Sequence, residues 1–290
     1  MLTAEEKLLR LGYARDTRVL IINGDDLGSS HAANTATFAA LERGLMTSAS
    51  LMAPCPWAYA ACRYCAEHQG LDVGVHLTLT SEWAMYRWGP VLGAGRCPSL
   101  VDEAGFFPRQ DSAVYDRATV EEAAAEAEAQ ICRLTEWGLD ATHVDGHMGV
   151  FYSHPRFLQI YVDLARRYDL PLRLPPRSLY VERGGVEWYD SLSLDGLWTV
   201  DHLRFVALRY PERLEVQLYE TLAQVEPGIT ELVLHAAAPT EESQAIQPDW
   251  QARAEAYRLV SAESPIRSEL ERLGIELIGW RSLRDAQHMQ

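Results

Sequence analysis

Short apolar runs rich in β-branched residues alternate with amphipathic stretches along most of this chain. The short runs predict seven strands: Val19 to Asn23, Ser48 to Ala53, Asp72 to Leu77, Ala141 to Gly146, Pro171 to Leu174, Glu231 to His235 and Ile275 to Trp280. Three- and four-residue apolar spacing predicts helices over His31 to Arg43, Pro56 to His68, Val120 to Trp137, Pro155 to Tyr168 and Asp249 to Ala262. This alternation is typical of an α/β fold with parallel strands.

Two long segments interrupt the alternation. Residues 81–118 and 179–198 are rich in Gly, Pro, Trp and Tyr, which predicts loop insertions that wall a substrate cleft. Neither segment resembles a linker, so one domain over residues 1–290 is expected. Their aromatic residues are candidates for stacking on sugar rings, with core packing as an equal alternative: Trp83, Tyr86, Trp88, Trp188, Tyr189 and Trp198.

Composition narrows the class of protein. The 290 residues are 48% hydrophobic, which is ample for a large core. The formal net charge of −15 disfavours nucleic acid and anionic membranes and favours a neutral or cationic small molecule. The N-terminus shows no secretory pattern, and no run approaches the roughly 20 apolar residues of a membrane span. The five cysteines argue against a disulfide framework, so a cytoplasmic protein is expected.

Residues able to carry out chemistry recur where the predicted strands end. They are Asp25 and Asp26, His76, Asp145 and His147, Arg173, and His235. The carboxyl ends of parallel strands in a barrel meet on one face, which is where the active sites of such barrels lie. We therefore expect residues far apart in the sequence to share one cavity.

Each of these residues, taken alone, has a simpler structural explanation. One of the paired aspartates could cap the helix that begins near His31, and a single strand histidine such as His76 is more often a packing residue. The row His143, Asp145 and His147 is different, because a spacing of two places all three on one face of a strand. An imidazole backed by a carboxylate is typical of a metal ligand.

Ordered motifs over nearly the whole chain resemble the YdjC-like carbohydrate deacetylase family. The motifs are Asn23-Gly24-Asp25-Asp26-Leu27-Gly28, Gly44 to Ser48, Gly74 to Thr80, Thr142 to His147, Leu172-Arg173, His235, and Gly274 to Arg281. Three positions depart from the family pattern. Leu27 replaces a phenylalanine, Met148 to Val150 replace further histidines, and the proline that normally follows the late histidine is delayed to Pro239.

The resemblance implies a single-domain, distorted seven-stranded (β/α) barrel of the polysaccharide-deacetylase type, similar to a TIM barrel. It implies a divalent metal ion bound by Asp26, His76 and His147. It assigns the general base to Asp25, the general acid to His235 and the orientation of the base to Arg173. One oxygen and two nitrogen ligands suit zinc, cobalt, nickel or manganese, and family members are also described with magnesium. A homodimer would match the family.

These assignments predict a metal-dependent hydrolase that removes an N-acetyl group from an acetylated amino sugar or oligosaccharide, with a metal-bound water as nucleophile. The alternatives are another barrel metallohydrolase, acting on a cyclic amide or an ester, and a non-catalytic sugar-binding protein that contains the metal. A glycosidase needs two opposed carboxylates, which adjacent aspartates do not obviously provide. A redox or zinc role for Cys62 and Cys65 is also open, although packing within the predicted helix is favoured.

Overall fold

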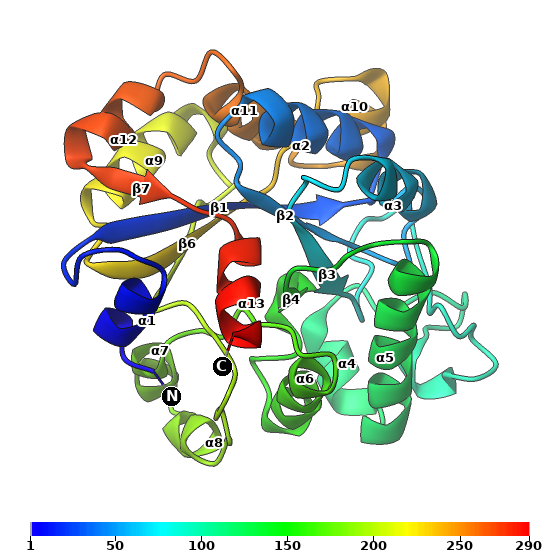
Figure 1. The fold of residues 1–290 in the computed structure, drawn as a ribbon. Coiled ribbons are helices and arrows are strands. Elements are labelled where there is room, and N and C mark those ends of the chain that lie inside the picture. The colour runs from blue at the N-terminus through cyan, green and yellow to red at the C-terminus, as the bar shows by residue number, and fades with distance from the viewer. Residues whose placement is uncertain (1, 290) are drawn as a thin grey trace.

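One parallel sheet of seven strands forms the centre of the computed structural model, which describes residues 2–289 (Figure 1). The strands are β1 (Arg18–Leu27), β2 (Ser48–Leu51), β3 (Val73–Leu77), β4 (Val144–Gly146), β5 (His202–Phe205), β6 (Gly228–Leu234) and β7 (Ile275–Leu277). Their order is β4-β3-β2-β1-β6-β5. β2 and β7 both pair with one edge of β1. β7 covers the first half of that edge, and β2 covers the second half.

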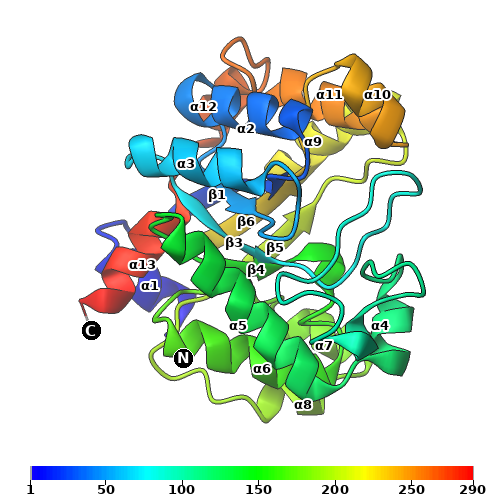
Figure 2. The ribbon, with the colours of Figure 1, turned by 90° about the vertical axis from the view of Figure 1, so that its right-hand side faces the viewer.

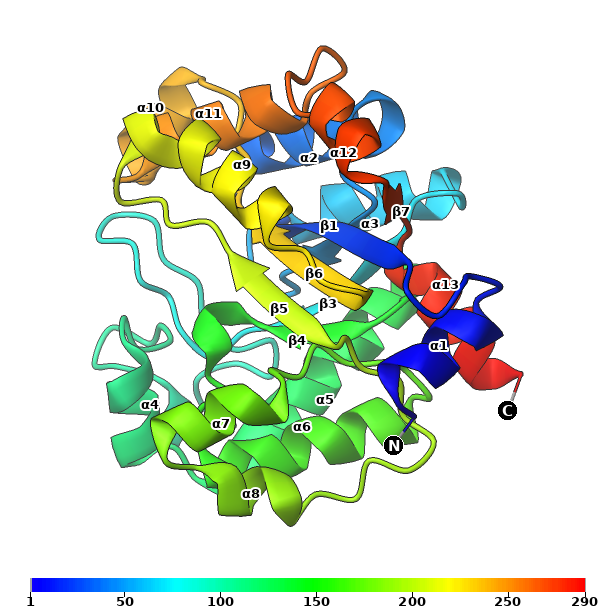
Figure 3. The ribbon, with the colours of Figure 1, turned by 90° about the vertical axis from the view of Figure 1, so that its left-hand side faces the viewer.

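Helices surround the curled sheet. They are α1 (Ala4–Arg10), α2 (His31–Arg43), α3 (Ala58–Glu67), α4 (Asp111–Arg117), α5 (Val120–Glu136), α6 (Pro155–Arg167), α7 (Arg177–Arg183), α8 (Val186–Asp190), α9 (Leu214–Ala223), α10 (Glu241–Ile246), α11 (Trp250–Val260), α12 (Arg267–Leu273) and α13 (Trp280–His288), with short 3-10 turns η1 (Pro98–Leu100), η2 (His147–Gly149) and η3 (Pro211–Arg213). Figures 2 and 3 agree in placing α1 and α13 near the end where strands begin, and α4, α7 and α10 toward the opposite end. Within residues 2–289, none of the helices has the length and apolarity that a membrane span requires.

The parallel α/β class is as predicted, but closure into a seven-stranded barrel is wrong. Residues 171–174 form no strand, and their ladder contact is a single bridge between Leu172 and Val144. Pro171 has no N–H to donate and two further prolines follow Leu174, so a regular ladder cannot extend there. The sheet is therefore a curled half-barrel.

Two elements of this region differ from the sequence prediction. β5 was not predicted, because its four residues are only partly buried and lack a clear apolar alternation. The second insertion is also not a plain loop, because α7 and α8 occupy half of it. Most of the insertion aromatics pack rather than face solvent: Trp83, Trp88, Tyr189 and Trp198 are buried, while Tyr86 and Trp188 are half-buried.

Alternate residues of β1 face two different apolar cores. Leu20 and Ile22 pack beneath the helices that cover the sheet, whereas Val19 and Ile21 pack in the core on the opposite face. Such a strand is apolar on both faces at its start. Because side chains alternate along a strand, Asp25 continues the face of Val19 and Ile21. The fold thus presents a carboxylate on the concave face, above an apolar floor.

Lys7 anchors α1 at the end of the sheet where the strands begin. Its Nζ donates to the Thr199 carbonyl oxygen at 2.8 Å and pairs with Asp201 at 2.5 Å. We expect Lys7→Met to lower the free energy of unfolding by about 1–3 kcal/mol, since it leaves a largely buried carboxylate without its cation. Urea unfolding measures this, with Arg10→Met on the exposed side of α1 as the control. Equal effects of the two substitutions would contradict the prediction.

Candidate metal centre

A bulge in β1 brings two neighbouring aspartates to one place. The pairing register of β1 with β2 shifts just before Leu27, and Asp26 adopts a φ of 68°. This left-handed conformation is one that aspartate tolerates better than most residues. As a result, Oδ2 of Asp25 and Oδ1 of Asp26 lie 3.8 Å and 3.5 Å from Nε2 of His76. A regular strand would send the two carboxylates to opposite faces.

The capping alternative for these aspartates is wrong. Helix α2 begins after Ser30, whose hydroxyl accepts the N–H of Ala33 at 3.0 Å. Asp25 and Asp26 are therefore not used to cap the helix, and both carboxylates remain in the site.

Asp26, His76 and His147 present one potential ligand atom each, and these three atoms lie within 4.8 Å of one another. Oδ1 of Asp26 is 3.2 Å from Nδ1 of His147. Among the described residues this oxygen has no hydrogen-bond partner although it is buried, whereas Oδ2 accepts from Arg253 at 2.7 Å. An unsatisfied buried oxygen is costly, and one oxygen with two imidazole nitrogens is a common donor set for a divalent ion. The three residues fit such an ion.

Each of the two imidazoles is backed by a second carboxylate. Nδ1 of His76 lies 2.6 Å from Asp145, its direct partner in the β3–β4 register, and Nε2 of His147 lies 3.0 Å from Glu82. Carboxylates in this position fix the ring orientation of metal ligands and strengthen their basicity. Both rings thus direct their other nitrogen toward Asp26.

A second group, Asp25, His76 and Asp145, also has potential ligand atoms within 4.8 Å of one another. Arg173 already occupies it: the guanidinium donates to both oxygens of Asp25 at 2.7 Å and pairs with Asp145 at 2.9 Å. It also makes two hydrogen bonds to Glu231, at 2.8 Å and 2.9 Å. A buried cation therefore already pairs with both carboxylates of this second group and with Glu231. Arg173 thus contacts both carboxylate oxygens of Asp25, and the orienting role that the family resemblance implies for it stays a prediction.

The family model described as YdjC-like protein matches residues 19–272. The chain belongs to the YdjC-like family. The family prediction made from the motifs is therefore confirmed.

Known relatives of this YdjC-like chain share most of its length. A protein of Thermus thermophilus named carbohydrate deacetylase is 36% identical over 287 residues, which cover 96% of this chain and 98% of the relative. A protein of the same name from Enterococcus faecalis is 33% identical over 210 residues, covering 71% of each chain. A solved structure from Enterococcus faecalis, named for cellobiose-phosphate cleavage, has a TM-score of 0.79 at 28% identity and covers 92% of this chain and 99% of that one.

Both aspartates of this YdjC-like site are ionised. Burial alone would raise the pKa of Asp25, but Arg173 and His76 outweigh it and lower that pKa below its usual value. Burial likewise opposes ionisation of Asp26, while Arg253 and the neighbouring histidines hold its pKa well below the usual range. The carboxylates are therefore available as a base and as a ligand at neutral pH.

The imidazoles respond to the same charges. Burial would lower the pKa of His76, yet Asp145 and Asp25 raise it to about 10. Burial is also outweighed at His147, where Glu82 and Asp26 raise the pKa to about 9. The surrounding carboxylates thus favour a positive charge at both rings.

His235 follows β6 and reaches the same site. By strand alternation it shares the face of Glu231, and Asp26, Asp25 and Arg253 are among the charges that act on it. Burial lowers its pKa, against the opposing effect of the two aspartates. Its Nδ1 is buried and lacks a hydrogen-bond partner within the described part of the chain. The ring is therefore neutral and has a free nitrogen.

Three charged residues of the site were not found from the sequence. Glu231 could have been flagged, because a glutamate within an apolar strand needs a buried cation. Arg253 lies on α11, and its Nε donates to the carboxylate of Asp249 at 2.9 Å. The two residues are four positions apart, and such a spacing fits an ion pair on a helix surface equally well. Glu82 lies in the first insertion, where no periodic pattern exists.

The cysteine pair of α3 is a packing feature. Cys62 and Cys65 are buried, and burial raises the pKa of Cys62 to about 11 and that of Cys65 to about 12. At pH 8 only about one Cys62 thiol in a thousand is a thiolate. We expect iodoacetamide to leave both unmodified in the folded protein at pH 8, while half-buried Cys132 reacts faster. Peptide mass spectrometry measures this, and rapid alkylation of Cys62 or Cys65 would reopen the redox interpretation.

Proposed function

We propose that this chain hydrolyses the N-acetyl group of an acetylated amino sugar or oligosaccharide, with a divalent metal ion held by Asp26, His76 and His147. One observation carries the proposal: the unpartnered Oδ1 of Asp26 faces two carboxylate-backed imidazoles, directly beside the ionised Asp25. The names of the Thermus thermophilus and Enterococcus faecalis relatives support the substrate class.

Asp25 is proposed as the general base. A divalent ion in this site would acidify a water molecule and polarise the acetyl carbonyl group. Asp25 takes a proton from the water molecule, and the oxygen of that water attacks the acetyl carbon. Arg173 holds both carboxylate oxygens, so the base keeps one orientation and stays ionised. The bidentate contact also explains why the adjacent Asp25 and Asp26 take different roles.

His235 is proposed as the general acid. The sugar nitrogen leaves as an amine only when a proton reaches it, after which the C–N bond breaks and acetate forms. Because the His235 ring is neutral in the resting site, it must first gain a proton, and its free Nδ1 or its Nε2 can carry it. The negative charges of Asp25 and Asp26 favour that gain.

Acetate release tests the proposal. The purified chain, loaded with zinc, cobalt, nickel, manganese or magnesium in turn, is incubated with N-acetylglucosamine and its oligomers, and acetate and free amine are measured. We expect both products in equal amounts and only with a metal present. Hydrolysis of cyclic amides or esters instead would favour another barrel metallohydrolase, and metal and sugar binding without products would favour a binding protein.

The cytoplasmic location and the homodimer remain predictions.

A further inference from the structure

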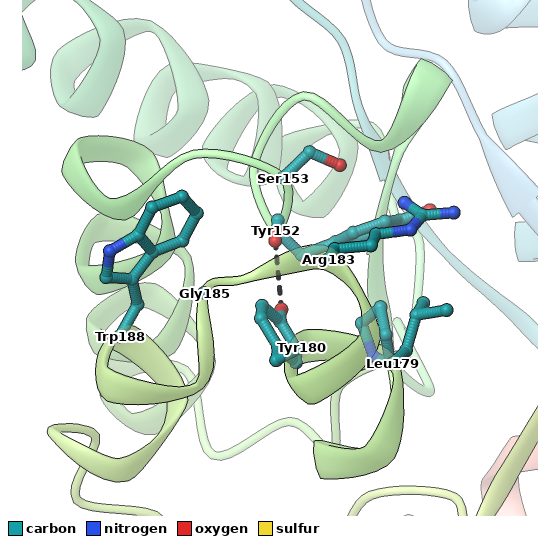
Figure 4. Close-up of a pocket in the computed structure, with 8 residues that line it drawn as sticks. Tyr152, Ser153, Leu179, Tyr180, Arg183, Gly185 and Trp188 are labelled. Carbon is teal, nitrogen blue, oxygen red and sulfur yellow. Dashed lines mark hydrogen bonds between the residues drawn. The ribbon is translucent and has the colours of Figure 1, made fainter.

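A small pocket lies beside the metal centre and is not used by the proposed mechanism. Figure 4 shows it between helices α7 and α8 of the second insertion and the loop that follows η2. Its volume is about 130 Å³. Pockets for whole small ligands are larger, on the order of 300–1,000 Å³, so this one suits a single small ring and not a long chain.

The residues that line the pocket follow closely, along the chain, on residues of the site. Tyr152 follows His147 by five residues, and two backbone turns keep that path short, with Val150 N–H donating to His147 O and Tyr152 N–H donating to Gly149 O. Fully extended, five residues would span at most about 18 Å, and the turns shorten this. The opposite wall begins at Pro175, two residues after Arg173.

Tyr152 is the wall shared by the pocket and the catalytic network. On the pocket side its carbonyl oxygen accepts the Tyr180 hydroxyl at 2.9 Å (Figure 4). Its buried phenol responds to the charges of the site: burial raises its pKa, Arg173 opposes this, and Asp25 adds to it. Tyr152 thus belongs both to the pocket wall and to the surroundings of Asp25 and Arg173.

The apolar part of the pocket is aromatic and fixed in place. Tyr180 is buried and held by its hydrogen bond to Tyr152, and the half-buried Trp188 packs over Gly185. A Cβ at position 185 would lie 2.7 Å from the Trp188 ring, so glycine is required for that packing. Rigid aromatic surfaces with a few polar groups suit the C–H face of a pyranose ring.

Arg183 supplies the polar part. Its side chain lines the pocket and is exposed, and no carboxylate of residues 2–289 forms an ion pair with it. By contrast Arg177, on the same helix, donates from Nε and Nη2 to the two carboxylate oxygens of Asp190, each at 2.6 Å. The guanidinium of Arg183 therefore keeps its donors for a ligand, and the hydroxyl groups of a sugar ring are suitable acceptors.

We infer that this pocket is an accessory saccharide site that binds a non-reacting, uncharged pyranose ring of an oligosaccharide whose acetylated ring lies at the metal centre. The ring stacks on Trp188 and accepts hydrogen bonds from Arg183. This inference rests on the proposed function, because only a substrate held at the metal centre would bring a second ring to the pocket.

Calorimetric titration of an Asp25→Asn background, in which turnover is blocked, tests the accessory site directly. The probes are N-acetylglucosamine and its disaccharide. We expect Trp188→Ala to lower the affinity for the disaccharide about 3- to 10-fold relative to the monosaccharide. Gly185→Ala should act in the same direction by displacing the Trp188 ring. Val181→Ala, exposed on α7 and outside the pocket, is the matched control and should change neither affinity.

The outcomes separate the accessory site from the proposed function. Equal changes for the two sugars, or no change in any pocket variant, overturn the accessory site. If Trp188→Ala does not fold by near-ultraviolet circular dichroism, Arg183→Ala gives the same comparison without touching an aromatic contact. Failure of the unmodified chain to release acetate from any sugar overturns the proposed function. The ratio of the affinities for the disaccharide and the monosaccharide does not depend on turnover, so it can still be measured.

Discussion

Asp25→Asn should abolish acetate release while leaving the metal bound. The substitution removes the proton acceptor but keeps the size of the side chain and one oxygen that accepts from Arg173. Loss of a general base costs typically 10²–10⁴-fold in rate, so we expect kcat to fall by about that factor. The measurement pairs acetate release with metal content by mass spectrometry on the same sample.

The control for this variant is Asp285→Asn, a carboxylate exposed on α13. It should retain full activity and full metal content. If Asp25→Asn keeps more than about a tenth of the activity, Asp25 is not the base, and a role for the site in binding alone becomes the better explanation.

His147→Gln should remove the metal and, with it, the activity. Glutamine can still contact Glu82, but it no longer offers an imidazole nitrogen to the ion. Loss of even an outer-shell partner costs about 10–100-fold in metal affinity, so loss of a ligand should cost about 100-fold or more. Competition with a chelator measures the affinity, and the same chelator should inactivate the unmodified chain until metal is restored.

The matched control is His288→Gln, a half-exposed histidine at the end of α13. Its metal affinity should equal that of the unmodified chain. Unchanged metal affinity in His147→Gln would instead remove this residue from the ligand set and direct attention to the second carboxylate group around Asp145.

The local pattern of the sequence determined most of the strands, but not the closure of the sheet. Apolar alternation located β1, β3 and β6 because their side chains pack on both faces. The segment at 171–174 carries buried leucines on either side of Arg173, yet regular backbone pairing there would need a donor that Pro171 lacks. β5 was missed because its pairing with β6, rather than its own composition, makes it a strand.

Convergence of the three predicted ligands followed from strand topology. The carboxyl ends of β1, β3 and β4 lie at one end of a single curled parallel sheet, with only β2 between β1 and β3, so Asp26, His76 and His147 were expected to lie near one another. The bulge at Asp26 could not be predicted, since it depends on a register shift against β2. Arg253 likewise reaches the site from a helix far along the chain, through tertiary packing that periodicity does not encode.

The shared edge of β1 has a consequence for biosynthesis. The first half of that edge is covered by β7, the last strand to be synthesised. Helix α13, which follows, supplies Trp280, whose indole N–H donates to Glu231 at 2.9 Å. A nascent chain that stops before residue 275 therefore exposes an unpaired strand edge and leaves the glutamate beneath Arg173 without one of its donors. Truncation before residue 275 should therefore give an aggregation-prone product, because the first half of that edge of β1 stays open until β7 pairs with it.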